Sequence, residues 1–291
     1  MITSQPRPVM LIHDMWLHAD ALARWVGFLG ARQRAAVTPG WPGEQATVSD
    51  TWDHTTSSGR LPAVGLVDLI DHFTEVARSF DRPPVIVGHG FGALVAEVLL
   101  ARGEAWAVAA IEPAVLRGVQ PLSWSQLVAG TLVMGAGIRR TQWTALDRRQ
   151  FRLMFGTAST ADSAAGLHRR WSIPAPVGPL VDAALGLVEL TGELSAARVP
   201  RQRHLVVTGG GDRLAPRGTV RSNLGSTALH PSSLHRVGGR GHSLAVGEGW
   251  LEIAHVVTAW LEEIDPPSRP ALVNASQLAV HQKTSALAHA S

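Results

Sequence analysis

The chain has 291 residues, of which 45% are hydrophobic and 17% charged, as is typical of a soluble globular protein with a large core. It contains no cysteine, which excludes disulfides, thiolate metal sites and a cysteine nucleophile. The pI is about 10.7 although the net charge is only +3. Because nearly all the cations are arginines and tyrosine is absent, this pI does not indicate a nucleic-acid-binding surface.

Strands and helices alternate through the first 115 residues. Short apolar, β-branched runs predict buried strands, and apolar residues at helical spacing predict the helices between them. The expected elements are a strand at 9–13, a helix at 19–30, a strand at 34–38, a polar loop at 44–62, a helix at 64–80, a strand at 84–87, a helix at 93–100 and a strand at 106–111. This order predicts an α/β fold with a doubly wound, mostly parallel sheet.

The alternation breaks at about residue 116 and resumes near residue 203. Residues 116–199 are rich in Leu, Ala and Arg with Pro and Gly interruptions, and they contain no convincing strand, so we expect an inserted helical lid. Strands at 203–208 and 233–237 and a helix at 248–264 follow. The expected organisation is a first part of the core at 1–115, the lid at 116–199, a second part of the core at 200–265 and a C-terminal extension at 266–291.

A glycine-rich pentapeptide, GHGFG at 88–92, lies where a strand is expected to pass into a helix. This is the context of the G-x-S-x-G nucleophile elbow of α/β-hydrolases, but its middle residue is Gly90 instead of serine. Glycine tolerates the strained backbone of such a turn, so we expect the turn to persist. The hydroxyl is lost, and with it the acyl-enzyme route.

Five segments in the right order resemble small bacterial α/β-hydrolases of the esterase, lactonase and haloperoxidase-like type. They are VMLIHDMW at 9–16, PGWPGE at 39–44, VIVGHGFGALVAE at 85–97, LVVTGGGDRLAP at 205–216 and RVGGRGHSL at 236–244. The resemblance extends from Pro8 to about Glu263. It implies that Asp212 is the catalytic acid and His242 the catalytic histidine, in the chain order this fold uses.

A second departure from the family lies in the first loop, which usually reads His-Gly and here reads His13-Asp14. If Asp14 points into the pocket, its charge opposes the oxyanion that acyl transfer requires. The backbone N–H groups of Phe91 and Met15 are the donors expected there. The paired changes at positions 14 and 90 indicate altered chemistry.

Three interpretations of Gly90 stay open. We favour a natural enzyme without a covalent intermediate, in which His242, oriented by Asp212, is the general base. Asp14 is then the candidate acid or second proton handler, and the reaction is a cyclisation, an elimination (lyase) or a water attack, of the kind found in secondary metabolism. The alternatives are a ligand-binding pseudoenzyme and a serine ester or lactone hydrolase captured as a Ser-to-Gly variant.

Tryptophan is frequent, with ten residues against six phenylalanines. We expect a substrate pocket for a bulky hydrophobic molecule, formed by Trp16, His89, Trp41, Trp124 and Trp143. The alternative is that these tryptophans only pack a lid onto the core. His13 and His89 both follow strand ends, where we expect them to hydrogen-bond the backbone.

The expected partner is a hydrophobic small molecule, and a homodimer is open. No histidine shows metal-ligand spacing and no dinucleotide fingerprint follows the first strand, so we expect no metal and no cofactor. The N-terminus lacks the pattern of a signal peptide. The apolar stretch at 127–138 is shorter than the roughly 20 residues that span a bilayer. We therefore expect no membrane partner, no nucleic acid and a cytoplasmic location.

Overall fold

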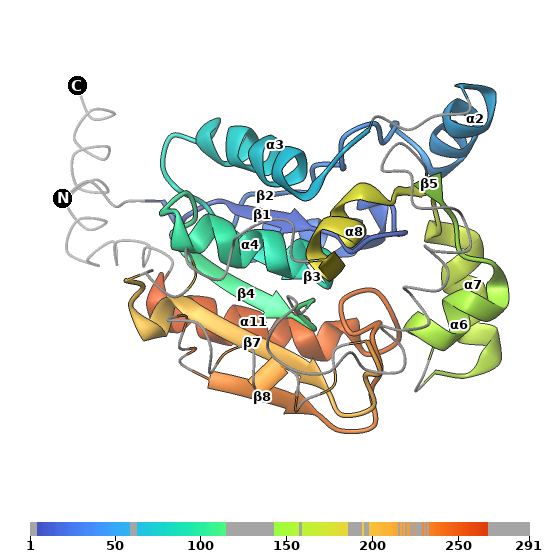
Figure 1. The fold of residues 1–291 in the computed structure, drawn as a ribbon. Coiled ribbons are helices and arrows are strands. Elements are labelled where there is room, and N and C mark those ends of the chain that lie inside the picture. Colours follow the sequence, from blue (N-terminus) through green and yellow to red (C-terminus); the bar gives the residue numbers. More distant parts are fainter. Residues whose placement is uncertain are drawn as a thin grey trace, which may run out of the picture.

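The computed structural model describes residues 5–58, 63–114, 143–156, 159–185, 198–214 and 233–266, with isolated residues between 185 and 233. A six-stranded sheet lies at its centre (Figure 1), in the order β2-β1-β3-β4-β7-β8, with every neighbouring pair parallel. The strands are β1 (Val9–Ile12), β2 (Ala36–Val37), β3 (Val85–His89), β4 (Ala107–Ile111), β7 (His204–Gly209) and β8 (Ser233–Val237). The predicted fold class is thereby confirmed.

The central strands are buried along their whole length, and this is why they read as continuous apolar runs in the sequence. Every residue of β1, β3, β4 and β7 is buried, as expected for parallel strands covered on both faces. In contrast, four of the five residues of the edge strand β8 are exposed or half-buried, and they include His235 and Arg236. Polar residues of this kind discourage edge-to-edge association of sheets.

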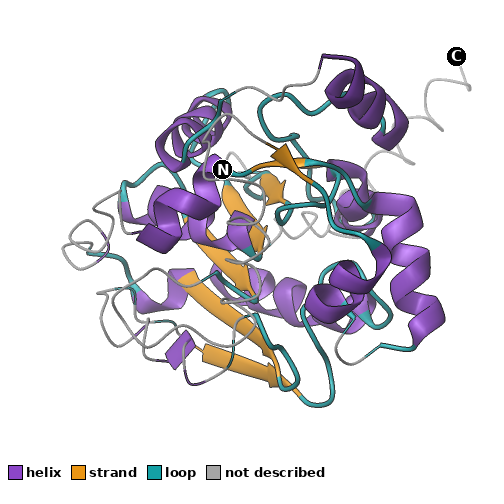
Figure 2. Cartoon of the chain, turned by 45° about the vertical axis from the view of Figure 1, so that its right-hand side comes forward, coloured by secondary structure: helices purple, strands orange, loops and turns teal. Residues whose placement is uncertain are grey.

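Helices cover the two faces of the sheet (Figures 1 and 2). They are α1 (Ala23–Gly30), which follows a 3-10 turn at Ala19–Leu22, α3 (Leu66–Arg78), α4 (Phe91–Ala101) and α11 (Trp250–Ile264). The chain moves one way along the sheet from β1 to β2, and the opposite way from β2 to β3 and β4. Right-handed crossovers therefore place α1 on one face and α3 with α4 on the other. The C-terminal α11 packs with α1, where Trp25 contacts Trp250.

Between β4 and β7 the described residues form α6 (Arg148–Phe155), α7 (Ala161–Trp171), α8 (Gly178–Leu185) and a two-stranded antiparallel pair. This pair, β5 (Trp143–Thr144) with β6 (Ala175–Pro176), shows that the expectation of no strand in the insert was wrong. Its two-residue strands are too short to leave an alternating pattern. That the insert acts as a lid stays a prediction, and the extension beyond Pro266 lies outside the described residues.

The polar loop expected at 44–62 is also wrong in part, because α2 (Val48–Ser58) occupies most of it. The hydroxyl of Thr47 accepts a hydrogen bond from the Asp50 N–H at the start of the helix, as an N-terminal cap does. The buried positions of α2 are Thr51 and Thr55. With threonines in place of aliphatic residues on the inner face, the helical period is invisible in a hydropathy pattern.

The strand order reverses at β1, which lies between β2 and β3. In open parallel sheets, ligands bind beyond the carboxyl ends of the strands at such a switch point. Asp14 follows β1 and Gly90 follows β3, so the two residues that depart from the family pattern flank this crevice.

Candidate functional site

The candidate site is formed by side chains that follow three strands. Asp14 comes from the loop after β1, Asp212 from the loop after β7 and His242 from the loop after β8, and all three are buried. Nδ1 of His242 lies 2.8 Å from Oδ2 of Asp212, and Nε2 lies 3.0 Å from Oδ2 of Asp14. The imidazole is thus held between two carboxylates.

The carboxylate of Asp14 fills the space that a nucleophile side chain at position 90 would need. Gly90 has the positive φ of a strained turn, +56°. A Cβ added to it would lie 2.1 Å from Cγ of Asp14 and 2.2 and 2.3 Å from its two oxygens, where real Cβ contacts are rarely below about 3.4 Å. Asp14 therefore occupies the space where a nucleophile side chain would stand.

Asp14 also takes the two backbone donors expected to form the oxyanion hole. Its Oδ1 accepts a 2.6 Å hydrogen bond from the N–H of Phe91 and a 2.8 Å hydrogen bond from the N–H of Met15. Phe91 begins α4, so this carboxylate lies at a helix N-terminus, where a negative charge is favoured. While Asp14 stays in place, neither donor is available to a substrate oxyanion.

The electrostatics of the site place the proton on His242. Burial alone would lower the pKa of His242, but Asp212 and the hydrogen bond to Asp14 raise it well above its usual value. Burial alone would raise the pKa of Asp14, but His242 and the Phe91 N–H lower it. At neutral pH His242 is therefore an imidazolium beside the Asp14 carboxylate, and it is not a free base.

Two further buried titratable groups lie behind His242. Nε2 of His89 lies 3.3 Å from Oε2 of Glu112 and 3.2 Å from the carbonyl oxygen of His242. Burial lowers the pKa of His89 to about 4, so the ring is neutral. Burial, reinforced by Asp212, raises the pKa of Glu112 well above its usual value, so that acid is protonated.

Sequence reasoning missed Glu112. Its carboxyl group accepts a hydrogen bond from the Leu244 N–H, two residues beyond His242, at 3.2 Å. The available signal was position, because an acidic residue directly after the buried strand β4 lies at the same sheet edge as the other site residues. The residue also has a positive φ of +50°, which is unusual for a non-glycine residue.

Among the residues that the structure describes, two overlapping groups of three side chains bring possible metal-ligand atoms within 4.8 Å of one another: Asp14, His89 and His242, and Glu112, Asp212 and His242. Both groups depend on His242. Since each of its ring nitrogens already faces a carboxylate, the cluster is arranged to hold a proton at that point. We assign no metal ion to it.

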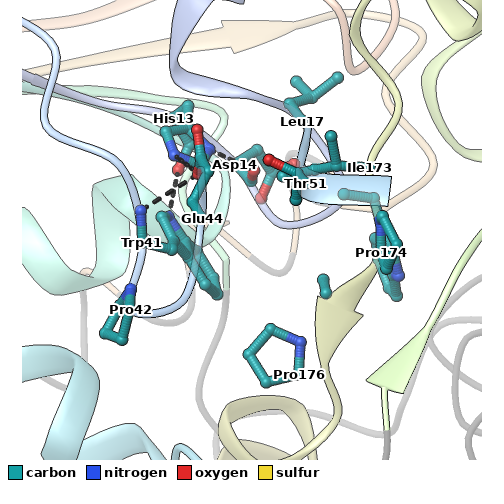
Figure 3. Close-up of a pocket in the computed structure, with 12 residues that line it drawn as sticks. His13, Asp14, Leu17, Trp41, Pro42, Glu44, Thr51, Ile173, Pro174 and Pro176 are labelled. Atoms are coloured by element: carbon teal, nitrogen blue, oxygen red, sulfur yellow. Dashed lines mark hydrogen bonds and ion pairs between the residues drawn. The ribbon is translucent and has the colours of Figure 1, made fainter. Parts of the chain in front are cut away.

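A cavity opens beside Asp14, between Trp41 and Pro42 on one side and Leu17, Ile173 and Pro174 on the other (Figure 3). Its full lining among the described residues is His13, Asp14, Trp16, Leu17, Trp41, Pro42, Glu44, Thr51, Ile173, Pro174, Ala175 and Pro176. The wall is thus mainly aromatic, aliphatic and proline.

The cavity wall differs in part from the predicted set of pocket residues. It includes Trp16 and Trp41, as expected. In contrast, Trp143 and His89 are not among the lining residues. Trp143 lies in β5 opposite Pro176, and the ring of His89 lies beside the ring of His242. Trp124 lies outside the described residues.

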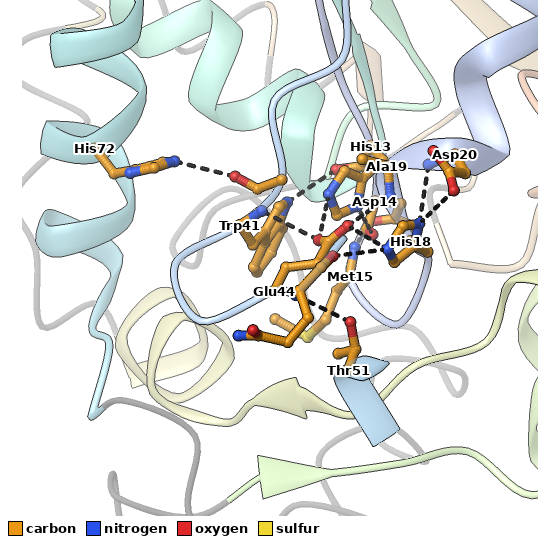
Figure 4. Close-up of polar contacts among 12 residues, drawn as sticks. His13, Asp14, Met15, His18, Ala19, Asp20, Trp41, Glu44, Thr51 and His72 are labelled. Carbon is orange, nitrogen blue, oxygen red and sulfur yellow. Dashed lines mark hydrogen bonds and ion pairs between the residues drawn. The ribbon is translucent and has the colours of Figure 1, made fainter. Parts of the chain in front are cut away.

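Glu44, one of the lining residues, holds neighbouring groups of the cavity wall in place (Figure 4). Its carboxylate accepts hydrogen bonds from the N–H groups of Ala19 and Trp41 and lies 3.0 Å from Nε2 of His13. Burial disfavours a charge on His13, but Glu44 raises its pKa. His13 also contacts the carbonyl oxygen of Asp14 through Nδ1, so this pair fixes the loop that carries Asp14.

The comparisons with known proteins support the fold and leave the reaction open. No protein-family model matches the sequence, and no curated protein is recognisably similar to it. Among solved structures, the chain resembles a monoacylglycerol lipase from Paleococcus ferrophilus, with 15% identity, a TM-score of 0.64, and coverage of 88% of this chain and 96% of the lipase.

Other solved structures with the α/β-hydrolase fold are similar to the chain to the same degree. An extracellular α/β-hydrolase from a Paenibacillus species has 15% identity and a TM-score of 0.63, covering 87% of this chain and 98% of its own. A meta-cleavage product hydrolase from Pseudomonas fluorescens has 16% identity and a TM-score of 0.62, and the match covers 90% of this chain and 93% of the hydrolase. The chain therefore has the α/β-hydrolase fold, as its sequence resemblance implied. Among the described residues, no helix combines the length and apolar character needed to cross a membrane.

Proposed function

We propose that this protein is an enzyme that removes and returns a proton on a bulky hydrophobic small molecule without forming a covalent intermediate. The observation that carries the proposal is the position of the Asp14 carboxylate. It overlaps the site of a Cβ at Gly90, holds both expected oxyanion donors and lies at the cavity wall. A site so arranged lacks both the nucleophile and the free donors of acyl transfer, but it offers a buried base.

The protonation of the array supports a different division of roles from the one expected from sequence. Asp14 is the ionised group at the cavity, so it is the base that accepts a substrate proton. His242, charged and held by Asp212, stabilises the ionised form of Asp14 and can donate a proton in turn. A base that takes a proton from one atom and returns it to another suits cyclisation or elimination, and the pair can also activate water.

A ligand-binding pseudoenzyme is the second candidate. It is supported by the internal pairing of the site, because Asp14 already accepts three hydrogen bonds within the protein. The interpretation as a captured serine hydrolase is less well supported, since a serine at position 90 would require Asp14 to leave these partners.

A generic proton-abstraction assay tests the proposal without knowledge of the native substrate. 5-Nitrobenzisoxazole is a flat aromatic molecule from which a base removes the ring C–H proton while the N–O bond breaks, releasing a coloured cyanonitrophenolate. We expect the protein to accelerate this elimination. The rate acceleration by Asp14→Asn should be at least about tenfold smaller, because a positioned base contributes roughly 10²–10⁴-fold.

The matched control is Asp20→Asn, which makes the same chemical change at an exposed carboxylate outside the cavity and should leave the rate unchanged. Equal rates for the protein and Asp14→Asn would contradict the proposal. Saturable binding of the probe without any acceleration would favour the pseudoenzyme.

A further inference from the structure

The imidazole of His13, the residue before Asp14, is buried between two oxygen atoms (Figure 4). Its Nδ1 lies 3.0 Å from the carbonyl oxygen of Asp14, and its Nε2 lies 3.0 Å from Oε2 of Glu44. Carbonyl and carboxylate oxygens accept hydrogen bonds but cannot donate them, and a neutral imidazole carries a proton on only one nitrogen. Either neutral form would therefore place a bare nitrogen against an oxygen acceptor. The imidazolium, with a proton on both nitrogens, satisfies both contacts.

The charges around His13 favour this doubly protonated form. Burial alone would raise the pKa of Glu44, but His13 lowers it. Burial alone would lower the pKa of His13, but Glu44 and Asp14 raise it. His18 also faces Glu44, with Nε2 at 3.4 Å from Oε1, but its Nδ1 accepts a hydrogen bond from the Asp20 N–H and so carries no proton. Of the two histidines beside Glu44, His13 is thus the one placed to pair with it as a cation.

The Nδ1–H of His13 acts on the peptide group between Asp14 and Met15. The carbonyl oxygen of this peptide contacts His13, and its N–H donates the 2.8 Å hydrogen bond to Oδ1 of Asp14. The C=O and N–H of a trans peptide point in opposite directions, so the two contacts fix its rotation together. The Leu17 N–H is another, longer donor to the same carbonyl oxygen, at 3.3 Å. Turning the peptide away from His13 would also turn the Met15 N–H away from the Asp14 carboxylate.

We propose that His13 is a positioning residue for Asp14, because its doubly protonated ring holds this peptide in the orientation that keeps the carboxylate in place. The two ring nitrogens have separate roles. Nε2–H anchors the ring to Glu44, and Nδ1–H holds the peptide. The positioning does not depend on a substrate, and only its effect on turnover rests on the proposed function. A catalytic group displaced by about 1 Å can lose roughly 10²-fold in rate.

The protonation of His13 can be read directly from its ring nitrogens. A long-range ¹H–¹⁵N correlation spectrum of the labelled protein at neutral pH distinguishes protonated from bare ring nitrogens, and single-residue variants assign the signals. We expect two protonated nitrogens for His13. His89 is the internal control, because its neutral ring should show one protonated and one bare nitrogen in the same spectrum. A bare nitrogen on His13 under these conditions would overturn the inference.

Two uncharged variants separate the roles of the two nitrogens. The side-chain NH₂ group of asparagine can take the place of Nδ1–H, and that of glutamine the place of Nε2–H. His13→Asn therefore keeps a donor for the Asp14 carbonyl, whereas His13→Gln keeps one for Glu44 and loses the hold on the peptide. We expect the Met15 N–H to exchange with D₂O about tenfold or more faster in His13→Gln than in His13→Asn, the effect of losing roughly one hydrogen bond.

The titration of His242 gives a second measure of where Asp14 lies. Burial lowers the pKa of His242, whereas Asp212 and the hydrogen bond between Nε2 and Asp14 raise it. If the Asp14 carboxylate is released, His242 should lose its proton at lower pH. We expect this shift in His13→Gln and a smaller one or none in His13→Asn. A merely structural role of His13 would move both variants alike.

Equal Met15 exchange and equal His242 titration in the two variants would overturn the inference. If neither variant folds, the ring nitrogens of His13 in the unaltered protein still decide it. The proposed function fails separately. A protonated His13 with the expected variant effects, but no acceleration of the 5-nitrobenzisoxazole elimination, would refute the enzyme and keep this inference. Catalysed elimination by a protein whose His13 ring is neutral would keep the enzyme and refute the inference.

Discussion

Restoring a serine at position 90 should not by itself restore a serine hydrolase. In Gly90→Ser the new Cβ would be placed 2.1 Å from Cγ of Asp14, so Asp14 must leave the Phe91 and Met15 N–H groups and His242. We expect Gly90→Ser to be destabilised by about 2–4 kcal/mol, because it breaks charge-assisted hydrogen bonds and puts a side chain at positive φ. The expected fall in Tm is roughly 3–7 °C for a chain of 291 residues.

Asp14→Gly combined with Gly90→Ser should behave differently, because the two changes relieve each other. Removal of the carboxylate makes room for the serine and frees both backbone donors for an oxyanion. His242 loses one of its two carboxylate partners, so its pKa should fall from its raised value toward the range in which the ring can act as a base. Asp212 still holds its other nitrogen.

The assay is hydrolysis of p-nitrophenyl butyrate, together with labelling by a fluorophosphonate read by intact mass. We expect only the double variant to be labelled. Its hydrolysis rate should be at least about 10²-fold above that of either single variant, because the nucleophile and a single oxyanion donor each contribute at least that factor. Asp14→Gly alone is the matched control without a nucleophile. Equal labelling of Gly90→Ser and the double variant, or a folded double variant that is neither labelled nor active, would refute the reasoning.

Two further predictions concern the groups behind His242. His89 stays neutral in the folded protein down to about pH 4, but in the unfolded chain it takes up a proton below about pH 6.5. The free energy of unfolding therefore falls as the pH falls through this window, by about 2–3 kcal/mol at pH 4.5. Urea unfolding at pH 7 and 4.5 should show a smaller loss for His89→Gln, and an identical loss would contradict the assignment. Glu112 is protonated in the fold but ionised above about pH 4.5 when unfolded, so Glu112→Gln, which takes up no proton on folding, should raise the free energy of unfolding at pH 7. A cost of about 3–5 kcal/mol, the value for breaking a buried ion pair, would show that Glu112 is charged and paired with His89.

The sheet could be predicted from the sequence because its strands are buried on both faces. Val85–His89 and Ala107–Ile111 are short apolar runs bounded by turns, and the expected strands match them to within a residue or two. The helix at Val48–Ser58 was missed because its inner face carries threonine hydroxyls bonded to the preceding turn. Local pattern cannot reveal a helix whose buried side is polar.

The members of the site could be listed from the sequence, but their arrangement could not. The resemblance pointed to Asp212 and His242, and the loop change pointed to Asp14. That Asp14 reaches across the crevice to position 90 depends on the spacing of β1 and β3 and on the direction of one side chain, and neither is encoded locally. The charge on His242 is likewise a property of the assembly, because it requires carboxylates on both ring nitrogens.

The two departures from the family pattern are best understood as one change. With a side chain at position 90, Asp14 could not lie where it does. With Gly90 but without Asp14, two backbone donors and one imidazole nitrogen would face the crevice unpaired, and buried polar groups in that state are costly. Glycine at the elbow and aspartate in the first loop therefore require each other, and together they fill the position of the three hydrogen-bond donors with a carboxylate.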